Sequence, residues 1–286
     1  MRINICFGAS ADYLQHVGCI IASILANSKH DEDDYHFYVL SGDFTPKDKG
    51  YFEELKNLRP FEIEYIKMND NDFEGAIHDP LGVSASYRLK IFELLSEDKV
   101  LYLDSDVIVR DDIRELYSTD ISDYYCAGVE DKQNPNLRER VSMPDSETYI
   151  NSGVLLLNLS KCRQDNIQEK MFNALRKIKY WSDQDAINGF MQRHIKLLDL
   201  KWNLMYPFDN CYEDKEYYEE VSKNPSIIHY TMVSKPWLPG SVAHMKVDYF
   251  KYLKLTPWYK DFFDTYVLEE NMQIVKLLSN LLDAIK

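Results

Sequence analysis

Short apolar runs rich in β-branched residues alternate with amphipathic segments over the first third of the chain, and this alternation limits the folds it can adopt. Such runs predict buried strands, and apolar residues at helical spacing predict helices that pack on them. Strands alternating with helices favour an α/β fold with a mostly parallel sheet covered by helices on both faces. The pattern predicts strands at 3–7, 35–40, 61–66 and 100–103, and helices at 13–26, 46–58 and 87–95.

The rest of the chain is less regular, but further apolar runs predict more strands. We expect strands at 107–109, 125–129, 150–159 and 227–228, a polar loop at 131–146, a helix at 183–192 and a helical segment at 259–285. In sheets of this class, ligands bind beyond the carboxyl ends of the strands. The residues that follow Phe7 and Leu103 are therefore the first candidates for a site.

The charge and the cysteines narrow the class of protein. A net charge of −14 argues against a nonspecific nucleic-acid binder, which would carry a basic stripe. The five cysteines are scattered, odd in number and without metal-ligand spacing, so we expect reduced thiols in a reducing compartment. The sequence opens directly on a predicted strand and has no apolar stretch long enough to span a bilayer, so we expect a cytoplasmic protein without a signal peptide.

Two acids lie together between apolar runs at Asp104-Ser105-Asp106. Both carboxylates leave the end of a predicted buried strand, and a divalent cation bound by their oxygens would relieve their mutual repulsion. The alternative is an ordinary polar turn, because Asp is common in turns.

A histidine and a lysine follow the predicted strand at 227–228. His229 stands at the strand end, and a neutral imidazole is a good ligand for Mn²⁺ and a poorer one for Mg²⁺. Lys235 lies a few residues on and would favour an anion such as a phosphate. The alternative for His229 is a partly buried histidine with satisfied hydrogen bonds.

Three further segments could approach a ligand. The small residues of Gly8 to Tyr13 join the first strand to the first helix, where Asp12 could accept hydrogen bonds from a base or ribose; the alternative is a plain turn. Asn151-Ser152-Gly153 heads a buried run, which suggests a closely approached backbone. Asp183-Gln184-Asp185 opens a helix, although the helix dipole alone would favour its acids.

Taken in order, these segments resemble family 8 of the glycosyltransferases, which includes bacterial lipopolysaccharide galactosyltransferases and glycogenin. The matching motifs span most of residues 1–237 and are Phe7-Gly8-Ala9, Tyr87-Arg88-Leu89, Leu101 to Asp106, Asn151 to Asn158, Asp183-Gln184-Asp185, His229-Tyr230 and Lys235-Pro236-Trp237. Each motif is weak alone, but the ordered set is specific.

The resemblance implies a GT-A fold, with a catalytic domain over 1–240 and a helical C-terminal extension over 241–286 packing on it. It implies a UDP-hexose donor and Mn²⁺, with Mg²⁺ as the alternative metal, held by Asp104, Asp106 and His229. It places the donor against Gly8, Ala9, Ser10, Asp12, Tyr13, Ser105, Asp131 and Lys235, and the sugar and reaction centre against Arg88, Asn151, Asp183 and Gln184.

Some positions depart from the family pattern. Met232 stands where a glycine is frequent, and Ser10 where an acid is frequent. The acid expected after the strand ending at Val129 is Glu130 or Asp131, of which we favour Asp131. Some relatives dock on membranes through a basic, aromatic tail. The tail of this chain carries the acids Asp261, Asp264, Glu269 and Glu270, so we expect it to pack on the protein, with weak membrane association if any.

The resemblance implies transfer with retention of configuration. The metal and Lys235 would stabilise the charge that develops on the departing UDP. Asp183 and Gln184 are both candidates for a nucleophile, if the protein supplies one. Two other functions stay open: a haloacid-dehalogenase-like phosphatase, and a nucleotide-sugar-binding module without turnover. The sequence does not separate galactose from glucose as donor, nor a glycan, a lipid-linked sugar and a glycosylated protein as acceptor.

Overall fold

The computed structural model describes residues 1–77, 82–133, 136–205, 214–231, 235–262 and 272. The positions of Cys211, Met232 and the three acids Asp264, Glu269 and Glu270 lie outside these residues, as does most of the helical segment expected at 259–285. In the part of the chain that is described, no helix is both long and apolar enough to cross a membrane.

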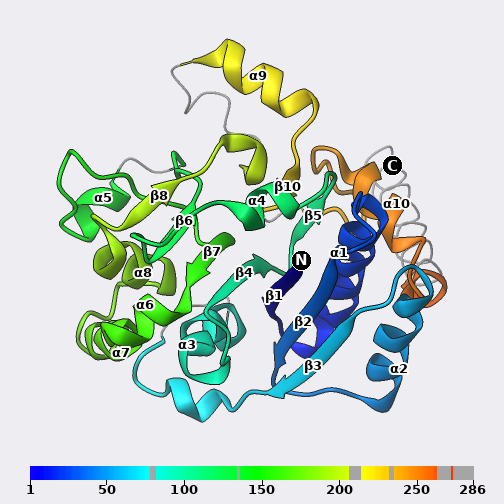
Figure 1. Cartoon of the computed structure of the whole chain (residues 1–286), viewed down its shortest axis with the longest axis horizontal. Helices are drawn as coiled ribbons and strands as arrows, with labels where there is room; N and C mark the ends of the chain where they lie inside the picture. The colour runs from blue at the N-terminus through cyan, green and yellow to red at the C-terminus, as the bar shows by residue number, and fades with distance from the viewer. Residues whose placement is uncertain (78–81, 134–135, 206–213, 232–234, 263–271, 273–286) are drawn as a thin grey trace, which may run out of the picture.

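A seven-stranded sheet forms the centre of the molecule, with strand order β3-β2-β1-β4-β7-β6-β8 (Figure 1). Its strands are β1 Arg2–Gly8, β2 Asp34–Ser41, β3 Glu62–Lys67, β4 Lys99–Asp104, β6 Cys126–Gly128, β7 Val154–Asn158 and β8 Ile195–Leu197. Within this sheet β7 runs against its neighbours β4 and β6, and the other pairings are parallel. The mostly parallel sheet predicted from the sequence is therefore confirmed.

A second, three-stranded sheet stands beside the first. It has the order β5-β10-β9, formed by Val107–Val109, Ile227–His229 and Leu204–Met205. β5 pairs antiparallel with β10, which pairs parallel with β9. The strand predicted at 107–109 is confirmed, but it leaves the main sheet after the turn that carries the two acids.

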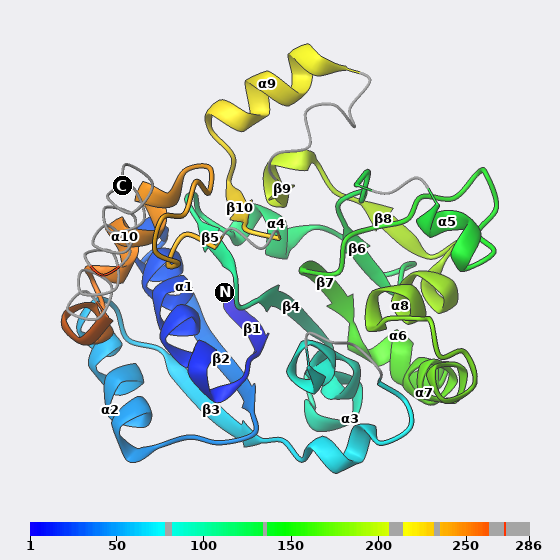
Figure 2. The same cartoon turned by 180° about the vertical axis from the view of Figure 1, so that it is seen from behind.

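Helices cover both faces of the main sheet (Figures 1 and 2). Two separate apolar clusters show this, because alternate residues of β1 fall into different clusters: Ile5 and Phe7 face α1, while Cys6 faces the side of α6 to α8. The α-helices are α1 Leu14–Asn27, α2 Pro46–Glu54, α3 Ile91–Leu94, α4 Arg114–Ser118, α5 Leu137–Arg140, α6 Leu159–Gln164, α7 Ile167–Lys177, α8 Asp183–Met191, α9 Lys215–Lys223 and α10 Lys246–Leu253. The 3₁₀ turns are η1 Ala11–Tyr13, η2 Leu55–Asn57, η3 Asp70–Phe73, η4 Val83–Lys90 and η5 Leu200–Trp202.

Four predicted elements differ from the observed ones. The helix expected at 46–58 ends as a 3₁₀ turn, and that expected at 87–95 is the end of η4 followed by the single turn α3. The loop expected at 131–146 contains α5. The strand expected at 150–159 begins only at Val154, because the backbone before it is drawn into contacts with polar side chains of the site described below.

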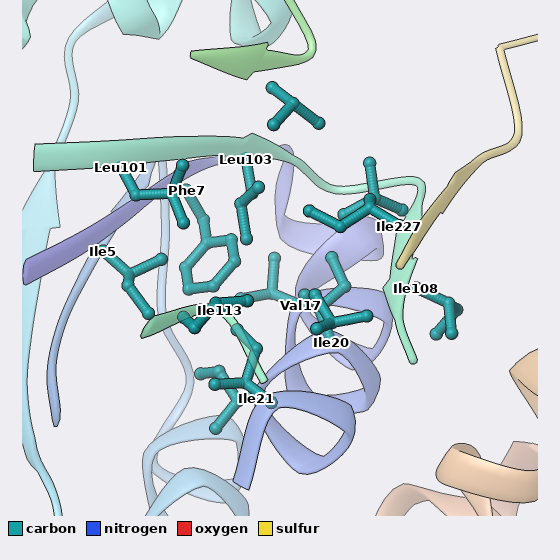
Figure 3. Close-up of a cluster of buried hydrophobic side chains, with 14 of the residues drawn as sticks. Ile5, Phe7, Val17, Ile20, Ile21, Leu101, Leu103, Ile108, Ile113 and Ile227 are labelled. Carbon is teal, nitrogen blue, oxygen red and sulfur yellow. The ribbon is translucent and has the colours of Figure 1, made fainter. Parts of the chain in front are cut away.

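Helix α1 fixes the edge of the sheet where the site lies. Figure 3 shows Val17, Ile20 and Ile21 of α1 meeting Phe7 of β1 and Leu103 of β4 in one buried cluster. Burying side chains of this size stabilises the fold by about 1.5–3 kcal/mol each. The ends of β1 and β4 are therefore held against each other by a rigid apolar layer.

The described part of the C-terminal extension packs on the other side of α1. Trp258 lies so close to Gly18 that a Cβ at this glycine would be 2.3 Å from the indole ring. Tyr249 of α10 is buried, and its hydroxyl lies 2.7 Å from Nδ1 of His16 on α1. Trp258 and Tyr249 thus contact α1, and the division into a catalytic domain and a helical extension stays a prediction.

Candidate active site

Strand pairing brings the polar motifs to one edge of the main sheet. The parallel register of β1 and β4 places Gly8 directly opposite Asp104. In the second sheet, β10 pairs with β5 so that His229 lies opposite Val107, and the Tyr230 amide donates to the Asp106 carbonyl at 2.9 Å. The end of β10 is thereby fixed against the turn that follows β4.

Asp104, Asp106 and His229 form a cluster that could hold a metal ion. One ligand atom from each lies within 4.8 Å of the other two. His229 Nε2 is 3.1 Å from Asp106 Oδ1 and 3.8 Å from Asp104 Oδ2. Two carboxylates and an imidazole are a donor set suited to a divalent metal ion. The absence of a side chain at Gly153 leaves space for this cluster, because a Cβ there would lie 2.1 Å from His229 Cε1 and 2.8 Å from Asp104 Oδ2. These residues fit a divalent cation.

Lys235 contacts the same cluster through Asp106. Its ammonium is 2.6 Å from Asp106 Oδ2 and also donates to the carbonyl of Tyr230. Burial alone would raise the pKa of Asp106, but its contact with His229 and the ammonium of Lys235 outweigh burial and hold that pKa below its usual range. Asp106 therefore stays ionised, with Lys235 as its counter-charge.

Arg88 links Asp104, one of the candidate metal ligands, to the start of α8. Its guanidinium is buried, with Nη2 2.9 Å from Asp104 Oδ1 and Nε 2.8 Å from Asp183 Oδ2. It also donates to the carbonyl of Ser152 at 2.6 Å, and the Tyr102 hydroxyl donates to Asp104. Burial alone would lower the pKa of Arg88, but Asp104 and its neighbours raise it, so the guanidinium stays charged. Arg88 thus holds two predicted site acids in fixed positions.

Neutral amides form the other side of the site. Gln184 accepts a hydrogen bond from the backbone N–H of Ser152 at 2.9 Å and donates to Asp131 Oδ2 at 3.0 Å. Asn151 lies between them, with its Nδ2 3.3 Å from Asp131 and 3.4 Å from Gln184. Asp131 is the acid that reaches this group, while Glu130 pairs with Lys132. A contact of Asp131 with the donor stays a prediction.

Asp185, the second acid of Asp183-Gln184-Asp185, has a structural role. Asp185 is fully buried and closes a capping box with Ser182 at the start of α8. It also accepts from Arg140 at 2.6 Å and from the Tyr149 hydroxyl at 2.8 Å. Asp185 therefore fixes α8, and with it Gln184, against the segment around α5.

The segment from Gly8 to Tyr13 lies at the same edge of the sheet as the acids. Ala9 donates to the carbonyl of Leu40, which continues the sheet pairing, and Ser10 and Asp12 then lead into η1 with Asp12 exposed. Ser105 occupies the turn between β4 and β5. The ring of Tyr13 meets that of Trp237 edge-on at 5.6 Å. Gly8 and Ser105 are therefore next to Asp104, and the donor contacts of this segment stay a prediction.

Trp237 attaches the segment of Lys235 to α1. Its indole stacks on the His16 ring with centroids 3.7 Å apart. Burial lowers the pKa of His16 to about 3, so the stacked ring is neutral near pH 7. Trp237 therefore links the segment of Lys235 to Tyr13 and His16, which follow β1.

Sequence reasoning missed Asn203. This side chain is fully buried and contacts both His229 and Asn151. A lone asparagine between apolar residues carries no pattern that could have indicated its position.

Comparisons with known proteins show the family of this chain. The sequence model of glycosyl transferase family 8 matches residues 4–240. The lipopolysaccharide 1,2-glucosyltransferase of Escherichia coli is 32% identical over 274 residues, which cover 89% of this chain and 79% of that protein. General stress protein A of Bacillus subtilis (strain 168) is 28% identical over 265 residues, which cover 87% of this chain and 92% of that protein.

Solved structures give the same result for the fold. The galactosyltransferase LgtC, in complex with donor and acceptor sugar analogues, superposes with a TM-score of 0.78 at 27% identity, covering 90% of this chain and 96% of LgtC. An active-site mutant of LgtC with glutamine replaced by glutamate superposes equally well, at 26% identity and with the same coverage of both chains. This protein has the GT-A fold, and it belongs to glycosyl transferase family 8.

Proposed function

We propose that this glycosyltransferase moves glucose or galactose from a UDP-sugar to a glycan, lipid-linked sugar or glycosylated protein, with retention of configuration. The observation that carries the proposal is the close grouping of Asp104, Asp106 and His229 at the strand edge beside the turn at Gly8. The glucosyltransferase and galactosyltransferase relatives support a hexose donor and a saccharide acceptor.

Mn²⁺ is the metal that this donor set favours over Mg²⁺, because one of the three ligands is an imidazole. A cation held by these residues would supply positive charge where the diphosphate leaves. Lys235 would supply a second positive charge at the same place, after exchanging Asp106 for a phosphate oxygen. Asp12 and Tyr13 would contact the ribose and the uracil.

The protein groups around the sugar would act mainly by position. Arg88 holds Asp183, and the Ser152 N–H holds Gln184, so both candidate nucleophiles have fixed orientations before the donor arrives. The replacement of a glutamine in the active-site mutant of LgtC supports a part for Gln184 at the reaction centre. Asn151 contacts Gln184 and Asp131 and would complete the surface against the sugar.

Thermal unfolding with UDP, UDP-glucose and UDP-galactose, each with Mn²⁺ or with a chelator, tests the donor site. A ligand that binds only the folded protein at 100 times its Kd stabilises it by about 2.7 kcal/mol. We expect a rise in melting temperature that needs both a UDP compound and Mn²⁺. The same pattern should be absent in Asp104→Asn and present in Asp111→Asn, an acid outside the cluster. No rise with any compound would contradict the proposal.

Hydrolysis of the UDP-sugar without acceptor separates the other two functions. Family membership argues against the phosphatase. A binding module without turnover would give the thermal shift but no UDP release. Slow, Mn²⁺-dependent release of UDP is the result that we expect.

A further inference from the structure

Asn203 occupies a special place beside the candidate metal ligand His229. It directly precedes β9, whose Met205 pairs with His229 of β10. The Asn203 side chain is fully buried, and its Oδ1 lies 2.9 Å from His229 Nδ1. The hydrogen on this contact can be assigned from the surrounding hydrogen bonds.

The assignment begins at a group that can only donate. The backbone N–H of Gly153 lies 2.9 Å from the Asn151 side chain, so the atom facing it must be the acceptor Oδ1. The Nδ2 of Asn151 then faces the Asp131 carboxylate at 3.3 Å, and an ionised carboxylate only accepts. The Gly153 N–H and the Asp131 carboxylate therefore both require the same orientation of the Asn151 amide.

The orientation of Asn151 decides that of Asn203. Asn203 meets the same Asn151 Oδ1 at 3.0 Å and must present Nδ2 to it. Its Oδ1 is then turned to His229 Nδ1, which must carry a hydrogen. In a neutral imidazole with hydrogen on Nδ1, Nε2 keeps its lone pair. This Nε2 is the atom 3.1 Å from Asp106 and 3.8 Å from Asp104.

We propose that Asn203 is a positioning residue that fixes His229 in the Nδ1–H tautomer, so that Nε2 is free to bind the metal. Metal-bound histidines in general donate their other ring N–H to a neighbouring acceptor, which also sets the orientation of the ring. The order of hydrogen bonds here is Gly153 N–H to Asn151, Asn203 to Asn151, and His229 to Asn203. The role in metal binding rests on the proposed metal site, whereas the tautomer does not.

The tautomer can be measured on the unaltered, metal-free protein. Two-bond ¹H–¹⁵N correlation spectra, recorded at a pH where the histidines are neutral, distinguish a protonated from an unprotonated ring nitrogen. The chain has seven histidines, and the signal of His229 is identified by its loss in His229→Gln. We expect hydrogen on Nδ1 of His229. An Nδ1 without hydrogen would overturn the proposal.

Variants test the link to the metal. Asn203→Leu removes the acceptor and should weaken binding of Mn²⁺ alone, measured by the electron paramagnetic resonance of free Mn²⁺, by roughly 10–100-fold. Asn203→Asp keeps an acceptor facing Nδ1 but sets an oxygen against Asn151 Oδ1. It should therefore retain most of the Mn²⁺ affinity while lowering the melting temperature. Asn4→Leu is the matched control, because Asn4 is a buried asparagine that contacts Lys99 and Tyr117 instead.

The outcomes separate the two proposals. Equal Mn²⁺ affinity in Asn203→Leu and the unaltered protein, or equal weakening in both Asn203 variants, would contradict a positioning role. An unaltered protein that shows the Nδ1–H tautomer but binds no Mn²⁺ would contradict the metal site and leave the tautomer assignment standing.

Discussion

The two sides of the candidate site are built on different principles. One side, the charged half, consists of Arg88, Asp104, Asp106, His229 and Lys235. The other side, the amide half, consists of Asn151, Ser152, Gly153, Gln184 and Asn203. In the charged half Arg88 holds Asp104 and Lys235 holds Asp106. In the amide half, hydrogen bonds begin at backbone N–H groups of the segment before β7.

This difference indicates which contacts change when ligands bind. A side-chain cation such as Lys235 can exchange a carboxylate for a metal-bound phosphate at little net cost, because charge is compensated in both states. A backbone N–H cannot move or exchange its role without moving the strand. We therefore expect the charged half to rearrange on donor binding and the amide half to act as a fixed template.

Replacing an acid of the charged half should have the largest effect. Asp106→Asn removes a candidate metal ligand, and we expect Mn²⁺ binding to be lost and the rate of UDP-sugar turnover to fall by roughly 1000-fold, as when a group that stabilises transition-state charge is removed. Asp111→Asn is the control, because Asp111 follows β5 and pairs with Lys29 at 2.5 Å. Near-normal turnover in Asp106→Asn would show that the charged half does not hold the metal.

The second-largest effect is expected from adding one methyl group at Gly153, where the charged half meets the amide half. In Gly153→Ala the new Cβ would meet His229 and Asp104, and overpacking of this kind costs about 1–3 kcal/mol. We expect a lower melting temperature together with weaker Mn²⁺ binding. Gly50→Ala on α2 is the matched control, since nothing lies within 4 Å of the new Cβ, and it should stabilise the protein by about 0.5–1 kcal/mol. Unchanged Mn²⁺ binding in Gly153→Ala would show that the halves are not coupled there.

A charge introduced into the amide half tests whether it is a template. Gln184→Glu sets a second carboxylate against Asp131, where the Gln184 amide now donates at 3.0 Å. We expect turnover to fall roughly tenfold, which corresponds to about 1.4 kcal/mol. Adding Asp131→Asn restores a donor between the two side chains and should recover part of the loss in a double-mutant cycle. Strictly additive losses would mean that this hydrogen bond does not orient Gln184.

The smallest expected effect has the opposite sign. Lys235→Met leaves Asp106 without one counter-charge, so Mn²⁺ without nucleotide should bind a few-fold more tightly, on the order of 1 kcal/mol. Binding of UDP in the presence of Mn²⁺ should weaken, because the phosphate loses its lysine. Lys90→Met is a control of similar exposure that pairs with Asp72 and Glu93. Weaker Mn²⁺ binding in Lys235→Met would show that the lysine does not compete for Asp106.

The sequence predicted the charged half better than the amide half. Asp104 and Asp106 follow a continuous buried strand, and the parallel pairing of neighbouring strands is enough to place them beside Gly8. The direction of β7 could not be predicted, because an apolar run looks the same in both directions. The position of Asn203 depends on the pairing of β9 and β10, two strands too short to show any periodicity. Asp185 matched a site motif, but its burial against Arg140 gives it a structural part.

The reversed direction of β7 decides which polar groups reach the site. β1 and β4 end at this edge of the sheet, and a strand that ends leaves carbonyl oxygens beyond its last pairing. β7 begins there, and the segment before it brings the amides of Ser152 and Gly153 to the same edge. Oxygens alone could attract cations but could not orient the oxygen of a side-chain amide. One strand running backwards makes a sheet edge that both attracts a cation and aligns neutral groups around it.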